Sequence, residues 1–181
     1  MSEEKQEKII KVIGNEIYFH VEVTDESVSE FILELRKLDL EMRSKFTDPT
    51  IRIYFNSPGG DLHSGLAAHD HIANCKSRVI TVATGLTASA AAIMFLGGHE
   101  RQIQRNAWIL IHQMSSDVWG SFNEMKAEVE NCALLMQQMR GLCKKYTSLS
   151  DEKIAELMTK DVLLSAKKCI KYGVASKICV D

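Results

Sequence analysis

Residues 79–98 read VITVATGLTASAAAIMFLGG, and this stretch decides which fold the sequence predicts. An apolar run with β-branched residues opens it and an alanine-rich run closes it, so the pattern predicts a buried strand followed directly by a helix. Ser89 lies at the junction of the two. A hydroxyl at the first turn of a helix lies beside free backbone N–H groups and the positive end of the helix dipole, which suits a nucleophile. The alternative is that Ser89 only caps a buried helix.

The rest of the chain also alternates between strand-like and helix-like patterns. Strands are expected at 17–23, 51–55, 79–83 and 107–111, with a last one at 174–180. Helices are expected over 24–38 and 65–72, after Ser89, and over 121–146, 151–158 and 165–172. Strands that are repeatedly followed by helices are typical of an α/β fold.

Composition and charge describe an ordinary globular chain. Its 181 residues are 45% hydrophobic and 25% charged with a net charge of −2, so one domain spanning 1–181 is expected. The basic residues are scattered, which argues against nucleic acid as a partner. The stretch 79–98 is interrupted by polar residues too often to span a membrane, and residues 1–14 lack the apolar core of a signal peptide. We therefore expect no membrane partner and a cytoplasmic location.

Five cysteines occur in the sequence, and none of them forms a C-x-x-C spacing with another. This odd number and these spacings disfavour both a disulfide framework and a zinc site. Neither a Walker motif nor a G-x-G-x-x-G dinucleotide motif occurs. We therefore expect no metal and no organic cofactor. A catalytic cysteine is an alternative, but none lies at a strand-to-helix junction as Ser89 does.

Three predicted strand ends carry groups suited to chemistry, namely the turn at 58–60, Ser89 and His112. Open α/β sheets bind ligands at the carboxyl ends of their strands. The two glycines of the turn would let backbone N–H groups approach a ligand, although an ordinary tight turn would also contain them. His112 could take a proton from a serine, and Asp161, between a helix end and an apolar run, could orient the imidazole. The rival histidines are His20, His63, His69, His71 and His99.

The predicted helix at 121–146 is long for so small a domain and carries a methionine-rich apolar stripe. A stripe that extends beyond the core of its own domain needs another surface to cover it, which predicts self-association. The alternative is that the stripe packs on the sheet of the same chain.

Four segments match one known family in their order and spacing. They are IYFNSPGGDLHSGLAAHD (53–70), GLTASAAAIMFLGG (85–98), LIHQM (110–114) and KDVLLSAKKCIKYGVA (160–175). Together they resemble the proteolytic subunits of the Clp proteases, the caseinolytic protease P family of serine peptidases. The resemblance covers roughly 17–180. It implies a crotonase-like α/β subunit of repeated β-β-α and β-α units, with a short polar N-terminal segment at 1–16 and a protruding handle helix at about 114–147.

The resemblance also implies functional residues and an assembly. It assigns a catalytic triad to Ser89, His112 and Asp161, an oxyanion hole to the backbone N–H groups of Gly59 and Ala90, and substrate binding to Gly60, Asp61 and Leu62. The implied reaction is hydrolysis of peptide bonds in unfolded proteins and short peptides. The implied assembly is a homo-oligomer of stacked heptameric rings whose handles meet, with an AAA+ unfoldase as a partner.

Departures from the family pattern leave alternatives open. Only the polar residues 1–10 precede the aligned region, where family members commonly carry a longer segment that engages an ATPase ring. Met114 replaces the usual proline, and Ala90 and Ala91 replace the usual methionine and glycine. The alternatives are a catalytically weak structural ring subunit, an acyl-CoA enzyme of the crotonase type and a relative of the signal-peptide peptidases.

Overall fold

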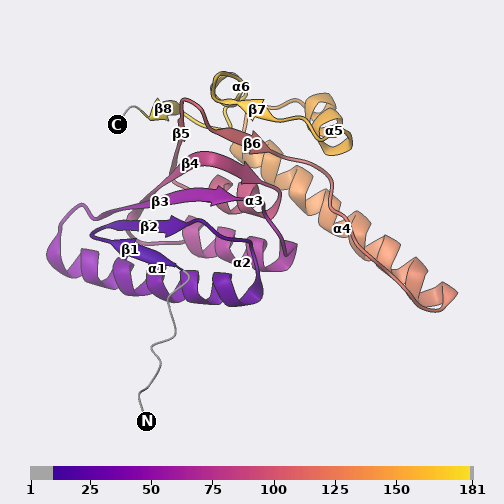
Figure 1. The fold of residues 1–181 in the computed structure, drawn as a ribbon, viewed down its shortest axis with the longest axis horizontal. Helices are drawn as coiled ribbons and strands as arrows, with labels where there is room; N and C mark the ends of the chain where they lie inside the picture. The colour runs from indigo at the N-terminus through magenta and orange to yellow at the C-terminus, as the bar shows by residue number, and fades with distance from the viewer. Residues whose placement is uncertain (1–9, 180–181) are drawn as a thin grey trace, which may run out of the picture.

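The computed structural model describes residues 10–179, which form a sheet flanked by helices (Figure 1). The strands are β1 (Lys11–Ile13), β2 (Glu16–Phe19), β3 (Thr50–Ser57), β4 (Arg78–Ala88), β5 (Glu100–Gln104), β6 (Trp108–Leu110), β7 (Leu164–Ser165) and β8 (Lys177–Cys179). They are arranged in the order β1-β2-β3-β4-β5-β8, while β6 pairs with both β4 and β7. The predicted α/β class is therefore confirmed.

Helices separate most of these strands along the chain. They are α1 (Asp25–Lys45), α2 (Leu62–Ala73), α3 (Ala90–Leu96), α4 (Phe122–Tyr146), α5 (Asp151–Thr159) and α6 (Ala166–Lys171). Figure 1 shows α4 extending away from the sheet and the shorter helices. None of the helices within residues 10–179 combines the length and apolar character that a membrane crossing requires.

Strand β4 is the element that positions the candidate site, because it pairs with two different strands along its length. Its first half, from Ile80 to Ala83, runs parallel to β5, and its second half, from Leu86 to Ala88, runs parallel to β6. Gly85 lies between the halves with a φ of 56°, and its Cα faces the side chain of Asn56, where a Cβ would meet Oδ1 at 2.6 Å. Only glycine fits this bend, which allows β6 to pair beside the end of β4.

The core lies between the sheet and its helices and is aromatic near β3. Phe55 of β3 contacts Phe19 and Phe95, and Phe19 in turn contacts Phe31 of α1 edge-on. All four rings are fully buried. Every residue of α3 is buried as well, so this short helix is the central one. Packing of these side chains therefore holds the helix in place, which matters for the residue that precedes it.

The helix predictions agree well with the structure. Thr24 caps α1 through the N–H of Ser27, and Ser121 caps α4 with a capping box that uses Glu124. Strands were predicted less completely. The sequence pattern did not predict β1, β5 or β7, and the predicted strand at 79–83 continues to Ala88. The strand predicted at 17–23 ends at Phe19, and Val180 of the last predicted strand lies outside the described residues.

The hairpin of β1 and β2 lies partly within the predicted polar segment 1–16. Ile13 pairs with Glu16 across a two-residue turn that begins at Gly14, whose φ is 59°. Ile10, which precedes β1, is fully buried. Residues 10–16 are therefore part of the folded body rather than a polar extension.

Candidate active site

Ser89 follows β4 and precedes α3 in a backbone conformation that L-amino acids rarely adopt. Its φ is 55° and its ψ is −126°, and within residues 10–179 it is the one non-glycine residue with a positive φ. Such a conformation costs about 1–3 kcal/mol and persists only where its surroundings hold it. The side chain makes no capping hydrogen bond to α3. The alternative that Ser89 serves only as a helix cap is therefore wrong.

The pairing of β4 with β6 brings His112 to the same edge of the sheet as Ser89. The two strands are parallel, with Ala88 opposite Leu110. The N–H of Ser89 donates to the carbonyl oxygen of Leu110 at 2.9 Å, which extends this pairing by one residue. His112 follows two residues after Leu110, and both Ser89 and His112 line the same cleft. The structure therefore brings these two residues together.

Asp161 reaches His112 from the segment after α5. The N–H of Gln113 donates to the carbonyl oxygen of Met158 at 3.1 Å, which ties the end of α5 to the residue beside His112. Oδ1 of Asp161 lies 3.4 Å from Nδ1 of His112. The Asp161 side chain is 73% exposed and that of His112 is 24% exposed, so water reaches this pair from the aspartate side. At this distance the contact is looser than a normal hydrogen bond.

The glycine turn after β3 packs directly against Ser89. Gly59 has a φ of 94°, and a Cβ built on it would lie 2.6 Å from Cβ of Ser89 and 2.7 Å from the carbonyl oxygen of Ala88. No side chain fits in that space, so only glycine allows this approach. The backbone of the turn is thus one of the surroundings that hold Ser89 in its unusual conformation.

The two glycines use their N–H groups differently. The N–H of Gly59 donates to Oγ of Ser57 at 3.1 Å in a buried position. Gly60 forms an isolated parallel bridge with Val23, in which the neighbouring residues 59 and 61 supply the hydrogen bonds. Within residues 10–179 no acceptor faces the N–H of Gly60. Gly60 lines the cleft and Gly59 does not, so Gly60 is the better placed of the two to donate to a ligand.

Three other residues assigned by the resemblance lie around Ser89. Ala90 begins α3, and its Cβ lies 3.0 Å from the position of a Cβ on Gly65, so α2 and α3 approach closely there. Leu62 lines the cleft. Asp61 also lines the cleft, but its carboxylate accepts from the N–H of Ser64 at 2.7 Å and so caps α2. Those hydrogen bonds lower the pKa of Asp61.

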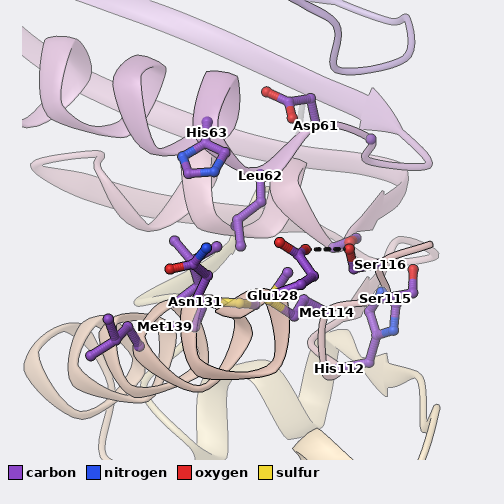
Figure 2. Close-up of a pocket in the computed structure, with 14 residues that line it drawn as sticks. Asp61, Leu62, His63, His112, Met114, Ser115, Ser116, Glu128, Asn131 and Met139 are labelled. Atoms are coloured by element: carbon purple, nitrogen blue, oxygen red, sulfur yellow. Dashed lines mark hydrogen bonds between the residues drawn. The ribbon is translucent and has the colours of Figure 1, made fainter. Parts of the chain in front are cut away.

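The cleft itself has a volume of about 530 Å³ and lies between α4, the start of α2 and the segment after β6. Figure 2 shows Leu62 and His63 projecting from one wall toward Glu128 and Asn131 on the other. Fourteen residues line it: Gly60, Asp61, Leu62, His63, Ser89, His112, Met114, Ser115, Ser116, Glu128, Asn131, Leu134, Leu135 and Met139. The α4 residues were missed by sequence reasoning, although their spacing of three to four residues places them on one helix face.

Two of the rival histidines bond backbone groups, and two of the cysteines are buried. His69 is 1% exposed and its Nδ1 lies 2.9 Å from the carbonyl oxygen of Ile93. Nδ1 of His99 accepts the N–H of Val79. Burial raises the pKa of Cys143 to about 11 and that of Cys169 to about 12, so both are protonated thiols at neutral pH. Within residues 10–179 no group of three or more histidines, cysteines or carboxylates is placed to hold a metal ion.

Comparison with known proteins identifies the family of this chain. The model of the family described as Clp protease matches residues 2–181. The chain belongs to the Clp protease family. It is 26% identical over 164 residues to the ATP-dependent Clp protease proteolytic subunit of Deinococcus radiodurans, covering 90% of this chain and 78% of the relative. It is 35% identical over 141 residues to the ATP-dependent Clp protease proteolytic subunit 2 of Treponema denticola, covering 77% of this chain and 70% of the relative.

Membership of the Clp protease family explains why the four segments at 53–70, 85–98, 110–114 and 160–175 occur together in one chain. In the structure, three of them converge on the cleft, because β3 leads to the glycine turn, β4 leads to Ser89 and β6 leads to His112. The fourth brings Asp161 to within 3.4 Å of His112. The family relationship and the names of the relatives support a peptidase.

Proposed function

We propose that this member of the Clp protease family is a serine endopeptidase with Ser89 as nucleophile, His112 as general base and Asp161 as the orienting acid. The observation that carries the proposal is the conformation of Ser89. A strained, non-glycine residue stands at the end of a central strand and lines a cleft, and the same cleft is lined by a histidine two residues beyond the end of the adjacent parallel strand. Such strain is typical of nucleophiles at strand-to-helix turns.

We assign a role to each imidazole nitrogen in the proposed reaction from the contact of Nδ1 with Asp161. Nδ1 carries the proton toward the carboxylate, which leaves Nε2 of His112 to accept the hydroxyl proton of Ser89. Oγ then bonds to the peptide carbonyl carbon, the imidazolium protonates the leaving amine as the C–N bond breaks, and an acyl-enzyme remains. Water, deprotonated by His112, hydrolyses the acyl-enzyme and restores the serine.

The negative charge on the tetrahedral intermediate needs backbone donors beside Ser89. Ala90 begins α3, so its N–H has no partner within the helix. For the second donor we favour Gly60 over Gly59, because the N–H of Gly59 already donates to Ser57 while that of Gly60 is open to the cleft. The same open edge of Gly60, followed by Asp61 and Leu62, suits pairing with an extended substrate as an added strand.

We further propose that the chain acts as a homo-oligomer of stacked heptameric rings in which α4 is the handle of a crotonase-like subunit. Apolar side chains at and just before the start of α4 support this assembly, since Trp119, in the segment before the helix, is 101% exposed and Phe122, its first residue, is 76% exposed. Side chains of this size rarely remain in water unless they cover a partner. An AAA+ unfoldase is the proposed partner that would deliver unfolded chains, and a cytoplasmic location stays a prediction.

The second candidate function is a catalytically weak ring subunit. One observation favours it, namely the 73% exposure of Asp161 at 3.4 Å from His112, because a solvated and loosely held acid orients an imidazole poorly. The two functions share an assembly and differ in turnover, so hydrolysis separates them.

Hydrolysis of a short internally quenched peptide by the purified protein tests the proposal, with the mass of each assembly measured by light scattering in the same samples. Ser89→Ala is expected to reduce turnover about 10⁴-fold or more and to keep the assembly. Ser115→Ala is the matched control, because it removes another hydroxyl from the same cleft and should keep activity. Turnover that survives Ser89→Ala would overturn the nucleophile assignment. An inactive but intact ring, unlabelled by a fluorophosphonate, would favour the structural subunit.

A further inference from the structure

The charged side chains of the cleft are unevenly distributed. Within the described residues, no lysine or arginine lines it, whereas Asp61 and Glu128 both do. The carboxylate of Asp61 is already engaged as the cap of α2. Glu128 is therefore the carboxylate that remains to meet a ligand, with the imidazole of His63 as the other titratable group near it on the opposite wall (Figure 2).

Glu128 is held in place at the mouth of the cleft by its neighbours. Its Oε1 accepts from Oγ of Ser116 at 2.6 Å and from the thiol of Cys132 at 3.6 Å. These hydrogen bonds lower the pKa of Glu128, so the carboxylate is charged at neutral pH. A carboxylate accepts about four hydrogen bonds, so it can still accept from a cationic ligand.

The segment from His112 to Ser116 connects the proposed catalytic histidine to Glu128. The N–H of Met114 contacts Sδ of Met136 at 3.3 Å and Ser116 contacts Glu128, so this segment lies along α4. Four residues of chain span at most about 13 Å when fully extended, so Ser116 lies no more than about 13 Å from His112. A substrate strand that runs beside the segment would therefore pass Glu128 about three to four residues from the bond at Ser89.

The apolar residues of the cleft do not distinguish one apolar side chain from another, so selectivity beside Glu128 depends on charge. Met114, Leu134, Leu135 and Met139 form an apolar lining that suits aliphatic or aromatic side chains of many shapes. We propose that Glu128 makes the cleft select peptides that carry lysine or arginine about three to four residues from the cleaved bond. This inference rests on the proposed peptidase function, because it names the substrate class of the same site.

The test compares three quenched peptides that differ only at the fourth residue from the cleaved bond, carrying lysine, glutamine or glutamate, with the series repeated on the other side of the bond. The lysine peptide is expected to have a kcat/KM about two- to fivefold above that of the glutamine peptide, which is the effect of one partly exposed ion pair. Glu128→Gln keeps an acceptor for Ser116 and should abolish the difference, while Glu128→Lys should favour the glutamate peptide. Added salt should shrink the preference.

Glu130→Gln is the matched control, since it removes the same charge from α4 at an exposed position outside the cleft and should keep the preference. Equal kcat/KM for all three peptides on both sides, with hydrolysis intact, would overturn the selectivity and leave the peptidase standing. If no peptide is hydrolysed, the proposed peptidase function is refuted. Binding of the same peptides to the Ser89→Ala variant, measured by fluorescence anisotropy, then tests the selectivity. Tighter binding of the lysine peptide that Glu128→Gln removes supports the inference, and equal binding overturns it.

Discussion

Replacing Gly59 by alanine tests the claim that the glycine turn holds Ser89 in its strained conformation. The new Cβ would lie 2.6 Å from Cβ of Ser89, 2.7 Å from the carbonyl oxygen of Ala88 and 3.1 Å from the nitrogen of Ala90. Two of these atoms belong to the backbone and cannot rotate away. The φ of 94° adds backbone strain of about 1–2 kcal/mol, and overpacking adds about 1–3 kcal/mol. We therefore expect the free energy of unfolding to fall by about 2–5 kcal/mol.

Gly14→Ala separates the two contributions. Gly14 also has a positive φ, 59°, but a Cβ there would meet nothing within 4 Å. The Gly14→Ala variant should therefore lower the free energy of unfolding by the backbone strain alone, about 1–2 kcal/mol. Urea unfolding followed by circular dichroism, at one protein concentration for all variants, measures both changes. The Gly59 variant should also react more slowly with a fluorophosphonate, since its clash displaces Ser89. If the two variants lost the same stability and reacted equally fast, the turn would not hold the serine.

Two further predictions concern the acid and a buried imidazole. Asp161→Asn should lower kcat by up to about 10⁴-fold by favouring the wrong tautomer of His112, and near-normal kcat for peptide hydrolysis would point to another acid. Burial lowers the pKa of His69 below 6.5, so its neutral form stabilises the fold fully above pH 6.5 and less as the pH falls through the lowered value. The free energy of unfolding should therefore drop on acidification by up to about 1.4 kcal/mol per pH unit more in the wild type than in His69→Gln. Equal slopes in the two proteins would refute the assignment.

Helices were predictable from the sequence because their signals are local. The Thr24 and Ser121 caps are read directly from the chain, and both helices begin at the next residue. The class of fold followed from the same patterns. Positions with hydrophobic residues at helical spacing bury one face regardless of which strand lies beside them.

Two of the missed strands, β5 and β7, depend on partners that are distant in sequence. Strand β5, with the sequence ERQIQ, is too polar to be read as a strand. It forms because β4 pairs with it on one side and β8 on the other, while Glu100 pairs with Lys177 of β8. Nothing within five residues of β5 shows that pairing, so its pattern could not predict it.

The candidate site was predictable as a set of residue types but not as a geometry. Residues 59, 89 and 112 were found from strand ends and from the family resemblance, yet only the structure shows that the N–H of Gly59 is engaged by Ser57 while Gly60 lines the cleft. Which of two adjacent glycines donates depends on the bridge to Val23, a contact across 37 positions of the chain. Sequence spacing carries no information on that choice.

The strained backbone at Ser89 also depends on contacts that are distant in sequence, because no local feature of the sequence favours a positive φ there. Alanine on either side would continue a strand or begin a helix without a positive φ. Three neighbours surround Ser89: the carbonyl of Leu110 accepts its N–H, Gly59 leaves no room for a side chain beside its Cβ, and the buried helix α3 begins at the next residue. The three constraints come from separate elements that the sheet brings together. Their packing offsets the backbone strain of about 1–3 kcal/mol at Ser89. A serine that only capped α3 would relax to an extended φ and form the capping bond that is missing here. The persistence of the strained form is therefore the physical reason to assign chemistry to this hydroxyl.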